Sequence, residues 1–225
     1  MSYSIIQVNL NGYDKTQSCL DRKSEKNLLI TDVHQNVNNW TEQIYQNPNR
    51  EFPFDDVFSI RWNVFNYLNT DYVIWIDGSN AILGNLDFLI QEMKNQQFDF
   101  AIVDHPFRDN IFDEYKEWCT IRHYDRNRAF DWLNHFSENG IDVKHSGLYQ
   151  ANVMIFKNTE RVKQFSAEMI KELHTFDKEH LDRLDQTVAT YLLKTKFSDL
   201  KILVLQKNIY HSNVIKMVCE HGNRK

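Results

Sequence analysis

Short apolar runs alternate with longer amphipathic segments along most of this chain. The clearest run is Tyr72–Ile76, five residues that are β-branched or aromatic, and it predicts a fully buried strand. Similar runs predict further strands at Ser4–Val8, Leu28–Thr31, Phe98–Val103, Asn152–Phe156 and Leu200–Leu205. The spacing of these runs leaves room for a helix between most successive strands.

The segments between the runs have the periodicity of helices. In Asp55–Leu68, the residues Val57, Ile60, Val64 and Leu68 share one side of a helix. Further helices are expected from Asn85, as the N-cap, to Lys94, over Glu160–Leu173 and over Leu181–Leu193. A charged and aromatic segment, Ile111–Ser137, has no strand pattern and predicts a helical insertion at about residues 108–140. From Ile209 onward the chain is expected to be polar and irregular.

Strands that alternate with helices are typical of an α/β fold with a mostly parallel sheet covered by helices. Right-handed crossovers then bring the residues that end or follow the strands, Asn9, Asp32, Asp77 and Asp104, to one edge of the sheet. We therefore expect one α/β domain over residues 1–225, with the helical insertion, and a functional site at that edge.

Composition narrows the classes of function. A chain of 225 residues with 42% hydrophobic residues fits one domain with a sizeable core. Its net charge of −5 argues against a protein that coats nucleic acid. The three cysteines share no metal-binding spacing, which favours a reduced compartment. Because there is no signal-peptide pattern and no apolar run near the roughly 20 residues that span a bilayer, we expect a cytoplasmic protein, with peripheral membrane contact as an alternative.

The strand Tyr72–Ile76 is followed by an acidic residue, Asp77, and then by Gly78 and Ser79. Ligands of open α/β sheets gather at the carboxyl ends of strands, and a carboxylate beside a turn of small residues suits a hard divalent cation. Together with His211, Asp77 could ligate Mn²⁺ or Mg²⁺. The alternatives are that Asp77 only caps a turn, as Asp-Gly pairs often do, and that His211 is a surface histidine.

A second candidate loop, Asp104–Arg108, also follows a predicted strand. The guanidinium of Arg108 suits a phosphate or a carboxylate, and His105 can donate a hydrogen bond to a hydroxyl or a phosphate. The alternative is a turn fixed by the proline of this loop, in which Arg108 pairs with Asp109 or Asp113.

Amide and carboxylate side chains precede the later elements. Gln150 and Asn152 lead into a predicted strand, and their amides both donate and accept hydrogen bonds. Near the start of a predicted helix lie Asp182, Asp185 and Gln186. The helix dipole alone favours acids there, whereas a carboxylate–amide pair would also bind a hexose. The chain has no Walker loop, dinucleotide glycine motif, zinc pattern or hydrolase elbow.

The segments that carry a family resemblance are Gly12–Asp14, Ile30–Asp32, Trp75–Ser79, His105–Arg108 with Glu114, Gly147–Asn152 and Asp185–Gln186. In this order they resemble the motifs of GT-A glycosyltransferases. More narrowly, over about residues 3–215, the chain resembles a family first catalogued as a domain of unknown function and later classed with the glycosyltransferases. That family includes plant mucilage-related proteins and bacterial capsule-locus proteins.

The resemblance implies a GT-A-like, Rossmann-type fold and a metal-assisted reaction of polysaccharide biosynthesis. A sugar would pass from a UDP- or GDP-sugar to a glycan or lipid-linked hydroxyl acceptor, with Mn²⁺ or Mg²⁺ bound. The implied donor-binding residues are Asn9, Asn11, Tyr13, Asp32, Arg61, Ser79, His105 and Arg108. The implied metal ligands are Asp77, Ser79 and His211, and the implied sugar or acceptor residues are Tyr149, Gln150 and Asn152. The catalytic candidates are Asp185, Gln186, Glu114 and Asp104, of which the three acids are candidate general bases.

One departure from the family pattern bears on the metal. Ser79 stands where the Asp-x-Asp motif has its second acid, and a hydroxyl is a weaker ligand than a carboxylate. Two other functions therefore stay open. One is a nucleotidyl- or phosphotransferase that uses the same edge of the sheet, and the other is a non-catalytic protein that binds nucleotide sugars or carbohydrate. Release of UDP or GDP, rather than pyrophosphate, would separate a glycosyltransferase from the first.

The insertion carries side chains that suit an acceptor. Its rings, which either stack on sugars or belong to the core, are Tyr115, Trp118, Tyr124 and Trp132. Its basic residues, which either bind an anionic or phospholipid-linked acceptor or lie on a solvated face, are Arg122, Arg126 and Arg128.

Overall fold

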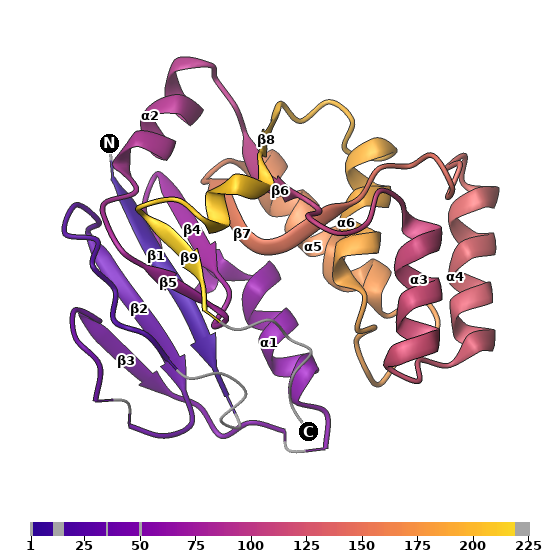
Figure 1. Cartoon of the computed structure of the whole chain (residues 1–225), viewed down its shortest axis with the longest axis horizontal. Helices are drawn as coiled ribbons and strands as arrows, with labels where there is room; N and C mark the ends of the chain where they lie inside the picture. Colours follow the sequence, from indigo (N-terminus) through magenta and orange to yellow (C-terminus); the bar gives the residue numbers. More distant parts are fainter. Residues whose placement is uncertain (1, 11–15, 35, 50, 219–225) are drawn as a thin grey trace.

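The computed structural model describes residues 2–10, 16–34, 36–49 and 51–218. Its centre is a seven-stranded sheet of order β3-β2-β1-β4-β7-β6-β8 (Figure 1). The strands are β1 (Tyr3–Asn9), β2 (Lys26–Thr31), β3 (Glu42–Tyr45), β4 (Tyr72–Ile76), β6 (Phe100–Asp104), β7 (Tyr149–Lys157) and β8 (Ile202–Leu205). All neighbouring pairs are parallel except the two that β7 makes, so the prediction of a mostly parallel sheet is confirmed.

The strand directions bring predicted site residues to one edge of the sheet. Asn9 and Asp104 are the last residues of β1 and β6, and Asp77 directly follows β4, so all three lie at carboxyl ends. Because β7 runs the opposite way, its first residue, Tyr149, reaches the same edge. There the backbone N–H of Asp77 donates to the carbonyl of Asn152 at 2.8 Å.

The side chains of the strands alternate between two faces, and a different layer covers each face. On β4, Val73 and Trp75 pack into one buried cluster, whereas Ile74 and Ile76 pack into the other. The helices on the Trp75 face are α1 (Pro53–Trp62), α5 (Glu160–Leu173) and α6 (Asp185–Lys194). The opposite face carries α2 (Asp87–Asn95) and a two-stranded antiparallel sheet of β5 (Asn80–Ile82) and β9 (Ile215–Met217) (Figure 1).

The predicted insertion forms two helices, α3 (Ile111–Ile121) and α4 (Arg126–Glu138). They lie side by side next to α6, at the opposite end of the molecule from β3 (Figure 1). Each helix has a side-chain cap, because Asn110 and Asp125 accept hydrogen bonds from backbone N–H groups in the first turns. The insertion therefore adds a helical layer and no strand within the described residues, as the sequence predicts.

The helix expected from Asn85 begins differently from the prediction. Its N-cap is Leu86, with no side-chain cap. Instead, the carboxylate of Asp21 accepts from the N–H of Leu86 at 2.7 Å, and the Asn85 Oδ1 accepts from the backbone N–H of Arg22 at 2.8 Å. The cap comes from a loop about 65 residues earlier in the chain, so the local sequence around Asn85 does not reveal it.

Other boundaries also shift. The helix expected over residues 55–68 ends at Trp62, and a single 3₁₀ turn, η1 (Val64–Asn66), follows it. The tail expected to be irregular contains the 3₁₀ helix η2 (Lys207–Tyr210) and the strand β9. The sequence does not predict β3, β5 or β9, because none of these segments of three or four residues contains a continuous apolar run like that of β8.

Two further findings bear on the sequence analysis. Within the described residues, no helix has both the length and the apolar character needed to cross a bilayer. Cys19 and Cys119 both carry free thiols, and burial raises the pKa of the Cys19 thiol to about 12.

Candidate active site

Asp77 lies in a tight turn between β4 and β5. The N–H of Asn80 donates to the Asp77 carbonyl at 2.9 Å, and the side-chain amide of Gln7 donates to the carbonyls of both residues at 3.1 Å. Ser79 and Asn80 are fully buried. Asp77 therefore does lie in a turn, as the alternative interpretation predicts. This turn holds the Asp77 carboxylate at the carboxyl edge of the sheet.

A buried arginine joins this carboxylate to a second one. Arg61, near the end of α1, donates from Nη2 to Asp77 Oδ1 at 3.2 Å and from Nη1 to Asp185 Oδ2 at 2.6 Å. Its guanidinium lies 5.0 Å from the ring centroids of both Phe58 and Trp75. Burial alone disfavours the charged form of Arg61, but the charges of Asp185 and Asp77 outweigh it, so its pKa is raised.

Asp185 is the first residue of α6, where the helix dipole favours an acid. Its Oδ2 also accepts from the indole N–H of Trp62 at 3.1 Å. Among the described residues, no group donates to its Oδ1, and this atom is not enclosed. One oxygen of Asp185 is therefore held by α1, and the other reaches solvent.

A second buried carboxylate lies beside the next residue of α6. Glu114, on α3, is fully buried. Its Oε1 accepts from the indole N–H of Trp118 at 2.8 Å and from the side-chain amide of Gln186, and its Oε2 accepts from Nε of Arg108. Burial raises the pKa of Glu114, although Arg108 and the other donors act against that rise.

The loop after β6 is a turn, but its arginine has a partner that the sequence does not predict. Arg108 pairs with Glu114, and its Nη1 lies 3.9 Å from Glu117, so the pairing with Asp109 or Asp113 that the alternative interpretation included is wrong. His105 accepts from the backbone N–H groups of Phe107 and Arg108 through Nδ1, which places the ring proton on Nε2. Burial first, and then the charge of Arg108, lower the pKa of His105 to about 3.

The two groups of side chains meet at the start of α6. Asp185 belongs to the first group, with Arg61 and Asp77, and Gln186 belongs to the second, with Glu114. Six of the residues singled out from the sequence are thus connected through hydrogen bonds: Arg61, Asp77, Asp185, Gln186, Glu114 and Arg108.

The remaining predicted residues are distributed along the same edge. Asn9 is buried at the end of β1, and Asp32 directly follows β2. Gln150 on β7 has a buried Oε1 with no hydrogen-bond partner among the described residues. Tyr149 is half-buried, and its pKa is raised by burial and by the nearby charge of the exposed Asp104. Asn11 and Tyr13 lie outside the described residues.

The C-terminal segment returns to the Asp77 turn. β9 pairs with β5, so that Met217 lies opposite Asn80, and the N–H of Val218 donates to the carbonyl of Ser79 at 2.8 Å. Tyr210 is buried, and its pKa is raised by burial and by the negative charge of Asp77. His211 therefore belongs to the segment beside the turn, although its side chain is exposed.

The donors near Asp77 suit a metal ion only in part. The Asp77 carboxylate and the Ser79 hydroxyl, whose Oγ lies 3.4 Å from Asp77 Oδ2, are hard oxygen ligands of the type that Mg²⁺ and Mn²⁺ take. In the described part of the chain, no three His, Cys, Asp or Glu side chains are grouped to hold a metal. These residues suffice only for an ion that also takes oxygen atoms from a bound diphosphate.

The insertion residues serve mainly to pack the helices. Tyr115 and Trp132 are fully buried in the core, so the core alternative describes them. Trp132 and Tyr124 both donate to the carboxylate of Asp182, which ties the insertion to the segment before α6. Arg128 lies 3.6 Å from Asp177, as part of the surface.

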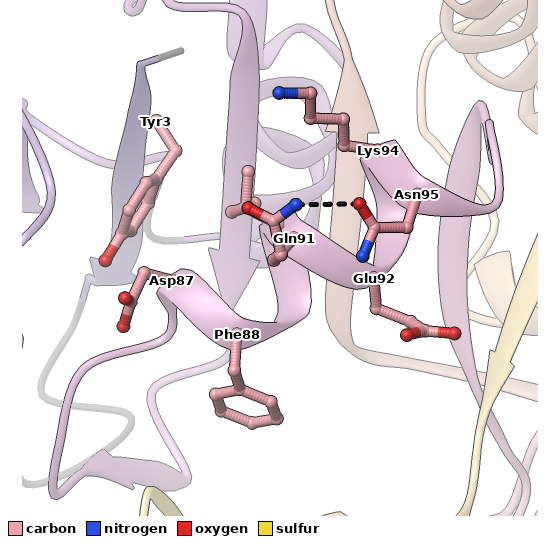
Figure 2. A pocket seen from close by; sticks show the side chains of 8 residues that line it. Tyr3, Asp87, Phe88, Gln91, Glu92, Lys94 and Asn95 are labelled. Carbon is pink, nitrogen blue, oxygen red and sulfur yellow. Dashed lines mark hydrogen bonds between the residues drawn. The ribbon is translucent and has the colours of Figure 1, made fainter.

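A separate hollow of about 420 Å³ lies against α2. Figure 2 shows the helix side chains around it, including Gln91, which donates to Asn95 at 2.7 Å. Among the described residues that line it, only Tyr3, the first residue of β1, lies outside α2, so the hollow lies at the amino edge of the sheet. The size would suit a small ligand, but none of the predicted site residues lines it, and we assign it no role.

Sequence reasoning missed the residues that hold the site in place. Trp62 and Gln7 each donate to a site residue, but both have the apolar or strand context of ordinary core positions. A usable signal was the adjacency of Arg61 and Trp62 at the end of a helix, because two neighbouring donors on one buried helix end require an acceptor.

Comparisons with known proteins bear on the fold. The sequence matches no protein-family model and no curated protein. The structure is similar to the crystal structure of mouse xyloside xylosyltransferase 1 in its apo form, with a TM-score of 0.51 over 91% of this chain and 85% of that chain, at 11% sequence identity. The chain therefore has the GT-A-like fold of a glycosyltransferase, as the sequence predicts, and the narrower family is not shown.

Proposed function

We propose that this protein is a glycosyltransferase that moves a sugar from a nucleotide-sugar donor to a hydroxyl acceptor. The observation that carries the proposal is the Arg61 bridge between Asp77 and Asp185, at the carboxyl edge of a sheet with a glycosyltransferase fold. Two carboxylates held by one buried arginine suit a ligand rich in hydroxyl groups, and a divalent ion at Asp77 would add the positive charge that a phosphate group needs.

The roles proposed for the residues follow from their positions. Asn9 and Asp32, at the ends of β1 and β2, would contact the nucleoside, together with Asn11 and Tyr13. The Arg61 guanidinium would stabilise the negative charge that develops on the leaving diphosphate. Gln150, whose buried Oε1 lacks a partner among the described residues, would accept a hydrogen bond from a sugar hydroxyl, beside Tyr149 and Asn152.

A divalent metal is part of the proposal. Asp77 and Ser79 would hold Mn²⁺ or Mg²⁺ with oxygen atoms of the diphosphate, and His211 lies on the adjacent segment. When bound, the ion would act as a Lewis acid at the leaving group. Because Ser79 supplies a hydroxyl and not a carboxylate, we expect weaker metal binding than a second acid would give.

The three candidate bases differ in their surroundings. Asp185 is ion-paired with Arg61 and bonded to Trp62, and Glu114 accepts from three donors, so structural partners already engage both carboxylates. Asp104 is exposed at the end of β6. We therefore favour Asp104 as general base if the reaction inverts the sugar configuration.

The acceptor would be a glycan or a lipid-linked hydroxyl, as in polysaccharide biosynthesis. The family resemblance to mucilage-related and capsule-locus proteins supports this class of acceptor, and the neighbouring structure is named as an enzyme that transfers xylose to a xyloside. The free thiols of Cys19 and Cys119 support a reducing compartment such as the cytoplasm.

The test is a thermal-shift screen of UDP-, GDP- and CMP-sugars with and without Mn²⁺, followed by an assay for released nucleoside diphosphate. We expect one sugar nucleotide to raise the melting temperature and to be consumed when an acceptor is added. Release of pyrophosphate would indicate a nucleotidyltransferase, and binding without turnover would indicate a non-catalytic protein. If no nucleotide sugar stabilises the fold, the proposal fails.

Two substitutions separate the roles at the Arg61 bridge. Asp77→Ala should abolish transfer and leave the far-ultraviolet circular dichroism unchanged, because Arg61 keeps its bond to Asp185. Asp185→Asn should lower turnover more than nucleotide affinity, since Asp185 faces the sugar and not the base. Full activity of Asp77→Ala, or equal losses of turnover and affinity in Asp185→Asn, would contradict these roles.

A further inference from the structure

The buried carboxylate of Glu114 gathers donors from three parts of the chain. Arg108 comes from the loop after β6, Trp118 from the next turn of α3, and Gln186 from the second position of α6. His105 is the fourth polar neighbour, with Nε2 at 3.9 Å from Oε2. Glu114 is fully buried, so its charge is compensated by these groups and not by water.

This arrangement fixes which way the Gln186 amide points. A carboxylate that pairs with an arginine accepts hydrogen bonds and donates none, and Arg108 contacts the Glu114 carboxylate directly. Gln186 must therefore turn its NH₂ group toward Glu114. Its carbonyl Oε1 then points the other way. Among the described residues, no group donates to this Oε1, and the atom is not enclosed.

Asp185, the residue before Gln186, also presents an acceptor oxygen. Asp185 Oδ2 is occupied by Arg61 and Trp62, which leaves its Oδ1 open in the same way. The first two residues of α6 thus each present an acceptor oxygen, one from a carboxylate and one from an amide. Asp185 has no donor, and one of the two N–H groups of the Gln186 amide is bonded to Glu114.

We propose that Glu114 is a positioning residue, which fixes the Gln186 amide so that its carbonyl oxygen, like Asp185 Oδ1, accepts hydrogen bonds from sugar hydroxyl groups. The inference rests on the proposed function and narrows the class of sugar that the donor carries. Two acceptor oxygens select neutral sugars with hydroxyl donors. They disfavour a sugar that presents a carboxylate, because like charges and unpaired acceptors would then face one another.

The first test measures the amide directly and needs no ligand. In protein labelled with ¹⁵N-glutamine, the side-chain resonance of Gln186 is assigned as the signal lost in Gln186→Asn. One of its amide protons should exchange slowly in the unmodified protein. Glu114→Gln should abolish that protection, since an amide has one acceptor oxygen, which the charged Arg108 takes, and an NH₂ group then faces Gln186. The matched control is Glu117→Gln, because Glu117 lies on the same helix and also faces Arg108.

The second test measures what the orientation does for binding. Titration calorimetry compares UDP with UDP-glucose, and GDP with GDP-mannose. Glu114→Gln should weaken binding of the sugar nucleotide about tenfold while changing nucleotide affinity little, since the acceptor oxygen is replaced by an NH₂ group. The double variant Glu114→Gln with Gln186→Glu restores an acceptor at position 186 and should recover part of the loss.

The outcomes separate this inference from the proposed function. Unchanged exchange of the Gln186 amide in Glu114→Gln would overturn the positioning role whatever the protein binds. Equal loss of nucleotide and sugar-nucleotide affinity, with no recovery in the double variant, would overturn it as well, because it would mark Glu114 as structural. If the unmodified protein binds no sugar nucleotide but shows the protected amide, the positioning stands and the proposed function fails.

Discussion

At the scale of single residues, the charged side chains of the candidate site form ion pairs that are almost completely buried. Arg61 is 5% exposed and lies between two carboxylates that are 9% and 4% exposed, Asp77 and Asp185. Burying charges is costly, and the cost is offset only while each partner stays in place. The bridge is therefore weak evidence for stability in itself, but removing Arg61 leaves both carboxylates uncompensated.

Replacing Arg61 should reveal that cost. In Arg61→Met, two buried carboxylates face each other without a cation, and we expect the free energy of unfolding to fall by about 4 kcal/mol, measured by urea denaturation. The control is Arg161→Met, which removes an exposed arginine paired with Asp199 and should change stability far less, since water screens that pair. Similar losses of unfolding free energy in both variants would show that the buried ion pairs of Arg61 contribute no more to stability than an exposed pair.

His105 should make stability depend on pH. Its pKa is lowered from 6.5 to about 3 in the folded protein, so below pH 6.5 protons bind the unfolded chain more readily. The contribution of His105 is thus complete above about pH 6.5 and is lost as the pH falls toward 3. We expect a loss of about 2 kcal/mol between pH 7 and pH 5.

The check is the difference between the unmodified protein and His105→Asn. Asparagine keeps an acceptor for the N–H groups of Phe107 and Arg108 but does not titrate. Since carboxylates such as Glu114 titrate in both proteins, subtracting the two urea-unfolding series isolates the histidine. Parallel pH profiles would show that His105 is not buried in its neutral form.

At the scale of elements, the sequence predicts what local periodicity can encode. The strand Tyr72–Ile76 and the helix Glu160–Leu173 are observed with the predicted bounds, because each has a clear hydrophobic period or run. The N-cap of α2 is not predictable in this way, since it depends on Asp21 from a distant loop. The site follows the same rule. Residue types at strand ends indicate Asp77, whereas the bond between Arg61 and Asp185 spans 124 positions and has no local signal.

The helical insertion depends on one carboxylate. Asp182 accepts from Tyr124 and from the indole N–H of Trp132, and also from the backbone N–H of Leu184. Asp182→Ala should leave these donors unsatisfied, lower stability by about 2 kcal/mol and speed hydrogen exchange in α4. The control is Asp131→Ala, which removes an exposed carboxylate on α4 itself. Unchanged exchange in α4 would mean that apolar packing alone holds the insertion.

At the scale of the whole molecule, the segment that contains β9 returns to the candidate site. β9 pairs with β5 next to the Asp77 turn, and Val218 donates to Ser79. A tail that looked irregular in sequence thus supports the residue on which the proposed metal and diphosphate depend. Sequence reasoning missed this because three-residue strands become stable only when a distant partner supplies their hydrogen bonds.

Weakening the tail should therefore loosen the turn. Ile215 is fully buried on β9, and Ile215→Ala should lower the free energy of unfolding by about 3 kcal/mol. It should also speed hydrogen exchange at the N–H of Leu83, which donates to Val214 at 2.7 Å, and at the N–H of Val218. Lys216→Ala, at an exposed position on the same strand, is the control and should do neither.

Binding of a sugar nucleotide should weaken in Ile215→Ala even at temperatures where the protein stays folded, because the Asp77 turn loses its support from β9. If exchange at Leu83 and Val218 rises while sugar-nucleotide affinity stays constant, the tail stabilises the fold without shaping the site.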